Sequence, residues 1–214
     1  MARRVEASRS YQSPVRQEQV ENTRRRVIEA AHRLFVERGY TGTIVAAVAA
    51  EAGVSPETIY GSLGGKRGLL ERVIEASIEG PDASVPFEQR AAFAKIVNLG
   101  TPRERLHAIV DYVCGILART SPVHAVIRGA ADGEPFAVDL RERLLQDRLA
   151  RFALLIRACF TGALRRRLTV QRASERLGAL LSPELHHLLT VELGWTPLEY
   201  KAWVSAVAEA DLLR

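Results

Sequence analysis

The stretch TIVAAVAAEAGVSPETIYGSL, Thr43 to Leu63, decides the fold. Apolar residues in its first half are spaced for one face of a helix, which we expect Thr43 to cap and Gly53 to end. After a single valine, Ser55-Pro56 favours the start of another helix, because serine caps free N–H groups and proline suits the first helical position. Two helices joined by so short a turn must cross steeply, as in a helix-turn-helix unit. The same pattern is also typical of an ordinary helical hairpin.

The flanking sequence extends this pair into a small helical bundle. Upstream, Val27, Ala31, Leu34 and Phe35 share one helical face, and Gly39 ends the run. From these patterns we expect helices near residues 21–38, 43–52, 55–63 and 66–79. The outer face of the third helix is small and polar, which suits insertion into the major groove of DNA.

The rest of the chain also has a helical period, and no stretch alternates apolar and polar residues as a half-buried strand does. Hydrophobic residues make up 47% of the 214 and aromatic residues only 6%, a mixture that favours helices. Beyond the N-terminal arm, five Ser-Pro or Thr-Pro pairs mark helix starts, at Ser55, Thr101, Ser121, Ser182 and Thr196. We expect further helices near 87–99, 102–119, 122–131, 135–167, 170–193 (kinked at Ser182-Pro183) and 197–212.

Charge and cysteine content narrow the class of protein. The formal net charge is +5, and residues 1–38 hold nine arginines against five glutamates, so the basic end is the N-terminus. A mild basic excess permits contact with nucleic acid or an anionic membrane. Cys114 and Cys159 do not make a disulfide framework, which favours a cytoplasmic location. The chain has no apolar run of about 18 residues, so we expect no membrane span.

The glycine-rich run IYGSLGGKRG, Ile59 to Gly68, raises the question of a nucleotide site. A phosphate-binding loop follows G-x-x-x-x-G-K-[ST] after a strand. Here Tyr60 occupies the place of the first glycine, Arg67 follows Lys66, and no strand precedes the run. These departures exclude a P-loop. No other catalytic motif or metal-ligand spacing stands out, so we expect no enzyme activity, no metal site and no cofactor.

Residues 23–74 resemble the DNA-binding domain of the TetR family of bacterial transcriptional regulators. The resemblance rests on I-x-A-A-x-x-L-F-x-x-x-G-Y from Ile28, A-G-V-S from Ala52, T-I-Y from Thr58 and K-x-x-L-L from Lys66. The last third is similar to a C-terminal domain of the same family through LSPELHHLL, residues 181–189, and GWTPLEYKAW, residues 194–203. The resemblance implies an all-α chain with a flexible basic arm at 1–20, a three-helix helix-turn-helix DNA-binding domain at 21–80, and a larger helical ligand-binding and dimerisation domain at 81–214.

The resemblance also implies which residues meet a double-stranded DNA operator. The helix near 55–63 would be the recognition helix, and Lys66 would bring a positive charge to a phosphate beside the free N–H groups of a helix start. The residues expected at the DNA are Thr43, Ser55, Glu57, Thr58, Tyr60, Gly61, Ser62 and Lys66. The arm could follow the minor groove or the backbone through Arg3, Arg4, Arg9 and Arg16, or it could be an inert tail.

The chain departs from the family pattern on this surface. Gly61 and Ser62 stand where family members often carry bulky side chains, followed by Leu63 in place of an aromatic residue. Ala46 and Ala47 stand where charged residues are frequent. The DNA-facing surface is therefore poor in side-chain donors. Either DNA shape contributes more to recognition, or affinity is modest and the arm compensates.

In the second domain the resemblance implies a ligand pocket and a dimer interface. The candidate pocket residues are Phe93, His107, Asp111, Tyr112, Cys114, His124 and Arg128. His107 and Asp111 are four residues apart, so they share a helix face, as a polar anchor or as a structural contact. The expected homodimer uses helices 135–167 and 170–193, with an apolar patch at Leu177, Leu180, Leu181, Leu185, Leu188 and Leu189. The alternative is that these leucines form an intrachain core.

Together these features predict a ligand-responsive transcriptional regulator, most simply a repressor. It would bind a palindromic operator as a dimer through helix 55–63 and would be released by a small-molecule effector whose identity the sequence does not give. Two alternatives stay open. One is a helical ligand-binding or protein-interaction module with weakened DNA binding, and the other is an activator of the same family.

Overall fold

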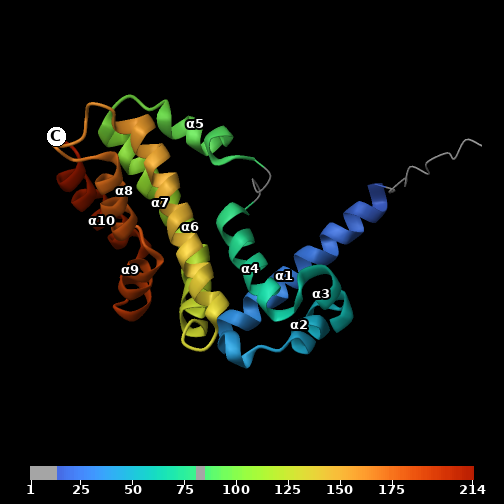
Figure 1. Ribbon diagram of the computed structural model, residues 1–214. Coiled ribbons are helices and arrows are strands. Elements are labelled where there is room, and N and C mark those ends of the chain that lie inside the picture. The colour runs from blue at the N-terminus through green and yellow to red at the C-terminus, as the bar shows by residue number, and fades with distance from the viewer. Residues whose placement is uncertain (1–13, 81–84) are drawn as a thin grey trace, which may run out of the picture.

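The computed structural model describes residues 14–80 and 85–214, and within these ranges the protein is all-α, as expected. Helices of the N-terminal part lie beside one end of a second, larger helical part (Figure 1). Among the described residues the only β contact is an isolated bridge between Leu164 and Leu213. Arg3, Arg4 and Arg9 of the expected arm lie outside the described residues, whereas its last residues, from Pro14, are already helical.

The N-terminal part contains the predicted helix-turn-helix. Its helices are α1 (Pro14–Gly42), α2 (Val45–Ala52), α3 (Pro56–Leu63) and α4 (Gly65–Glu79). Gly39, with φ 69° and ψ 178°, interrupts α1, where the sequence predicts its end. Gly53, with φ 66° and ψ 41°, ends α2 in the left-handed conformation that favours glycine. Ser55 then caps α3, because its side chain accepts a hydrogen bond from the N–H of Thr58.

Thr43 has a different place from the one predicted. The N-cap of α2 is Ile44, which makes no side-chain capping bond, so the expectation that Thr43 caps this helix is wrong. Thr43 is 1% exposed, and its hydroxyl donates to the carbonyl oxygens of Leu34 (3.0 Å) and Gly39 (2.8 Å). A capping pattern cannot reveal that these two carbonyl oxygens of α1 are close enough to accept the Thr43 hydroxyl.

In the second part, three predicted boundaries are wrong. The expected helix 87–99 divides into η2 (Phe87–Gln89) and α5 (Ala91–Val97), because Arg90 between them is extended. The expected pair 102–119 and 122–131 is one continuous helix, α6 (Pro102–Ala130). The long helix α7 (Pro135–Phe160) ends before residue 167, in a turn where Gly162 has φ 79°.

The C-terminal helices agree more closely with the sequence prediction. Expected helix 170–193 is broken at Ser182-Pro183 into α8 (Val170–Leu180) and α9 (Pro183–His187), followed by the π-helical turn η3 (Leu188–Glu192). Ser182 caps α9 by accepting from the N–H of Leu185. The last helix, α10 (Pro197–Leu212), begins with the predicted capping box between Thr196 and Glu199.

Two apolar cores hold these helices together. The first joins α1–α4 to the C-terminal half of α6 and the start of α7, through Val123, Ile127 and Phe136. The second lies among α5–α10 and includes Leu106, Phe152 and Tyr200. Because α6 contributes to both cores, it connects the N-terminal helices directly to the second part (Figure 1).

Candidate nucleic-acid interface and ligand pocket

The outer face of α3 is the candidate nucleic-acid interface. Ile59, which is fully buried, and Leu63, which is partly buried, anchor this short helix in the first core. Ser55, Glu57, Thr58, Tyr60, Gly61 and Ser62 are all exposed. The structure therefore brings six of the eight expected DNA residues onto one exposed face. Thr43 is not among them, because its side chain is buried against α1.

Much of the polar capacity of this face is used inside α3 itself. The Ser55 hydroxyl accepts from the N–H of Thr58 and lies 3.2 Å from the Thr58 hydroxyl, while the Ser62 hydroxyl donates to the Thr58 carbonyl oxygen at 2.5 Å. The groups with most reach are Glu57 and Tyr60, and Tyr60 is 60% exposed. The N–H of Glu57 and the Ser55 hydroxyl lower the pKa of the Glu57 carboxyl, which therefore stays ionised at neutral pH.

Lys66, the expected phosphate ligand, lies at the junction of α1 and α4. Its Nζ donates to the carbonyl oxygen of Thr41 at 3.3 Å and lies 4.4 Å from the centre of the Tyr40 ring, a cation–π distance. Burial lowers the pKa of Lys66, against the opposite effect of the Glu134 carboxylate. These two contacts hold the ammonium against the end of α1.

Two consecutive glycines form the turn between α3 and α4. Gly64 and Gly65 have φ of 73° and 76°, so the chain reverses between α3 and α4 without strain. A Cβ on Gly65 would lie 3.0 Å from Cε1 of Tyr60. The Tyr60 ring therefore packs directly over the backbone of Gly65, which fixes where the exposed phenol points.

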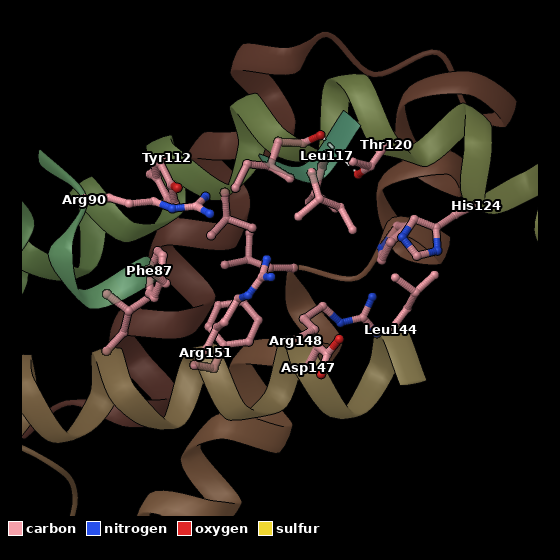
Figure 2. Close-up of a pocket in the computed structure, with 17 residues that line it drawn as sticks. Phe87, Arg90, Tyr112, Leu117, Thr120, His124, Leu144, Asp147, Arg148 and Arg151 are labelled. Carbon is pink, nitrogen blue, oxygen red and sulfur yellow. Dashed lines mark hydrogen bonds between the residues drawn. The ribbon is translucent and has the colours of Figure 1, made fainter. Parts of the chain in front are cut away.

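A cavity of about 100 Å³ lies in the second part, enclosed mainly by α6 and α7 and closed by η2, α4 and the α8–α9 turn. Figure 2 shows Arg148 and Arg151 extending from α7 toward Tyr112, Leu117, Thr120 and His124 of α6. Most of the lining is apolar. Its charged residues are Arg90, Asp147, Arg148 and Arg151.

Of the seven predicted pocket residues, Tyr112 and His124 line this cavity. Phe93 does not line the cavity itself. It packs edge-on against the lining residue Phe87, with ring centres 5.4 Å apart. The other four are placed elsewhere. His107 lies 3.4 Å from Glu209 and Asp111 pairs with Lys201, Cys114 borders a separate cleft beside His186, and Arg128 is exposed.

His107 and Asp111 do share a face of α6, as their spacing indicates, but both partners belong to α10. The pair therefore serves as a structural contact between two helices. It does not reach the cavity.

The sequence interpretation missed the arginines of α7. Arg148 lies four residues after Leu144, and Arg151 four before Leu155, so both occupy positions on the apolar stripe of α7. A charge at a stripe position is the signal that could have identified them, because long charged side chains on a buried face must have a partner.

Arg148 and His124 face each other at one end of the cavity (Figure 2). Burial is the main cause that lowers the pKa of His124 to about 4, and Arg148, Arg128 and Arg141 lower it further, while Glu184 raises it. The imidazole is therefore neutral at physiological pH. Burial also lowers the pKa of Arg148, against the effect of Glu184.

Residues 14–80 and 85–214 contain no group of three or more His, Cys, Asp or Glu side chains placed to hold a metal ion. Among the same residues, none of the helices combines the length and apolarity needed to cross a membrane.

Comparison with known proteins gives a sequence match over the N-terminal helices. Residues 27–73 match the family model described as bacterial regulatory proteins, tetR family. The HTH-type transcriptional regulator HbdR of Aromatoleum sp. (strain CIB) is 33% identical over 99 residues, which are 46% of this chain and 40% of that protein. The aligned part of the chain thus spans less than half the length of this curated relative.

Solved structures share the fold along most of the chain. A protein of Rhodococcus sp. described as a TetR-family transcriptional regulator has a TM-score of 0.69 at 20% identity, covering 89% of this chain and 98% of its own. NalD of Pseudomonas aeruginosa, the secondary repressor of the MexAB-OprM multidrug efflux pump, has a TM-score of 0.68 at 19% identity, with 91% and 98% covered. A transcriptional regulator of Saccharomonospora viridis, solved with choline, has 0.67 at 22%, with 91% and 99% covered.

Proposed function

Because the chain belongs to the tetR family of bacterial regulatory proteins through residues 27–73, we propose that it is a ligand-responsive transcriptional repressor. In this proposal a dimer binds a palindromic operator, with α3 of each copy in the major groove. A small molecule in the cavity between α6 and α7 then releases the DNA.

The main support for this proposal is that α4 connects the cavity to α3. Ile78, in its last turn, lines the cavity, while its first residue, Gly65, packs against Tyr60 of α3. The last turn of α4 is also fixed to α6, since Nε of Arg119 donates to the carbonyl oxygen of Ser77 at 3.2 Å. A ligand that touches Ile78 differently in two positions of α4 shifts the equilibrium between them, and α3 moves with α4.

The dimer surface requires a change from the sequence prediction. Leu177, Leu181 and Leu189 of the expected patch are buried in the second core, and Leu180 and Leu185 pack against it. Only Leu188 of that patch is exposed. In the second part most of the exposed large apolar side chains lie on η3, α10 and the turn between them: Leu188, Val191, Leu193, Leu198 and Trp203, the most exposed being Leu198 at 74%. The other two, Val138 and Leu145, are on α7.

We therefore place the homodimer contact on η3 and α10, which lie on the outer side of the second part (Figure 1). A two-fold interface there apposes the same patch of two copies, so each exposed apolar residue gains an apolar partner. It also leaves α3 of both copies free for two half-sites, about 34–36 Å apart for successive turns of DNA.

The second reading is a ligand-binding module with weak DNA binding. The exposed face of α3 supports it, because Gly61 has no side chain and the Ser55 and Ser62 hydroxyls are engaged within the helix. Glu57 also brings a negative charge to a surface meant for phosphates. An activator with the same architecture remains the third reading.

Fluorescence anisotropy with DNA from upstream of the protein's own gene separates these readings. We expect salt-sensitive binding that a shuffled duplex of equal composition does not reproduce.

Tyr60→Phe should weaken binding broadly, without changing the sequence preference. Lys66→Met should lower the slope of log K against log salt by about one unit, whereas Lys95→Met, on exposed α5, should leave it unchanged. If no duplex from that region binds more tightly than the shuffled one, the module reading replaces the repressor.

A further inference from the structure

Arg148 has a guanidinium nitrogen without a partner. Among the described residues, its Nε is one of two buried side-chain nitrogens that make no hydrogen bond, the other being Nδ1 of His187. Arg148 lines the main cavity, and it also lines an adjoining groove together with His124 and Glu184. A buried donor without an acceptor destabilises the protein, and a charged donor does so more strongly. An acceptor brought by a ligand removes that destabilisation.

The charged residues that line the cavity indicate whether its ligand is an anion or a cation. Three guanidinium groups, of Arg90, Arg148 and Arg151, line the cavity against one carboxylate, that of Asp147. Arg90 is already engaged, because its Nε donates to the carbonyl oxygen of Val85 at 2.9 Å. His124, at the Arg148 end, is neutral and offers a ring nitrogen rather than a negative charge. The lining therefore favours an anion and disfavours a cation.

The rest of the cavity wall is apolar, so it favours a ligand whose remaining part is also apolar. Phe87, Leu117, Phe152 and Leu155 line the cavity, and α4 adds Ile78. A ligand with its acid group at Arg148 can therefore cover apolar surface toward α4. The narrow space selects a compact body rather than a large fused-ring molecule.

We infer that the cavity binds a compact organic carboxylate, with its acid group on Arg148 and its apolar body directed toward Ile78. A guanidinium presents two parallel N–H groups that match the two oxygens of a carboxylate. This names the chemical class of the effector, and only its effect on DNA rests on the proposed function.

Isothermal titration of the full-length protein tests the ligand class with defined probes. The probes are phenylacetate, 3-phenylpropanoate, hexanoate and octanoate, each compared with its primary amide, together with phenethylamine as a cation of similar shape. We expect at least one carboxylate to bind at least about tenfold more tightly than its amide, the discrimination that one charge-assisted pair provides. Phenethylamine should not bind.

Variants assign the preference to one side chain. Arg148→Met keeps the length of the side chain but removes its charge, and it should abolish the preference for acid over amide. Arg157→Met, at an exposed position of the same helix, should leave the preference intact. Arg148→Lys keeps the charge without the planar fork and should give an intermediate preference. The comparison in the unmodified protein needs no variant, so it holds even where Arg148→Met does not fold.

The inference is overturned if none of the four carboxylates binds, if acid and amide bind equally, or if the preference survives in Arg148→Met. The same probes added to the protein–DNA complex test the regulatory role separately. A carboxylate that binds with the expected preference but leaves DNA anisotropy unchanged supports the ligand class and contradicts the effector role. Specific DNA binding without any carboxylate binding contradicts the ligand class and supports the operator binding of the proposed function.

Discussion

At the scale of single residues, Gly61 and Gly68, seven residues apart in the sequence, face very different surroundings. A Cβ on Gly68 in α4 would lie 1.6 Å from the carbonyl oxygen of Leu63, so the end of α3 and the start of α4 meet closer than any side chain permits. A Cβ on Gly61, in α3, would meet nothing within 4 Å. Gly68 is therefore a packing requirement, while Gly61 is a bare position on an exposed face.

We predict opposite effects of alanine at these two positions. Gly68→Ala should lower the free energy of unfolding by at least about 2 kcal/mol, because α3 and α4 must separate to admit a methyl group. Gly61→Ala should raise it by up to about 1 kcal/mol, because alanine restricts the unfolded chain and favours the helix. Urea denaturation followed by circular dichroism measures both. Equal effects of the two substitutions would contradict the contact at Leu63.

Sequence patterns predicted residues whose role is local and missed those whose role depends on distant neighbours. Ser55 caps α3 as expected, because its acceptor and the N–H that it meets are three residues apart. Thr43 fits the same local pattern, yet its hydroxyl meets carbonyls of α1. Arg148 was missed because only the packing of α6 against α7 puts its side chain at the cavity.

At the scale of helices, a hydroxyl residue followed by proline predicts a helix start except where tertiary contacts override it. The pairs at Ser55, Thr101, Ser182 and Thr196 each cap a helix. The fifth pair, Ser121-Pro122, lies inside α6. There the Ser121 hydroxyl is 2.9 Å from Nδ1 of His186 instead of capping the next turn. Buried residues on both sides of the pair keep α6 continuous against its neighbours.

Pro122 is therefore a proline in a helix interior, where it removes one backbone hydrogen bond. We predict that Pro122→Ala raises the free energy of unfolding by about 1–2 kcal/mol, since the restored bond exceeds the entropy that proline removes from the unfolded chain. Pro102→Ala is the matched control, because Pro102 is at the first position of the same helix, where the N–H has no intrahelical partner. It should change stability by less than about 0.5 kcal/mol. Destabilisation by Pro122→Ala would show instead that packing requires the proline ring.

At the scale of the whole molecule, the sequence predicted which helices exist better than which faces they expose. The all-α class and the order of helices follow from local periodicity and start signals. The outward face of α10 does not, because the burial of Leu177 and Leu189 depends on how α8, η3 and α10 pack together. This is why the predicted dimer surface falls on leucines of the intrachain core.

The revised dimer surface makes a direct prediction. Leu198→Glu places a charge at the most exposed apolar position of α10 and should give a monomer by sedimentation velocity, with operator binding weakened at least tenfold. Val36→Glu, at an exposed apolar position of α1, introduces the same charge away from this surface and should remain dimeric. A dimer that persists in Leu198→Glu would move the interface to another face.

The shared helix α6 has a consequence for how the molecule can be divided. With 29 residues, α6 is about 43 Å long and passes through both cores. A fragment that stops at residue 80 keeps every helix of the DNA-binding motif but loses Val123, Ile127 and Phe136, which complete its core. The DNA-binding region is thus not autonomous. An engineer who wishes to transplant it would need to carry the far half of α6 and the beginning of α7 with it.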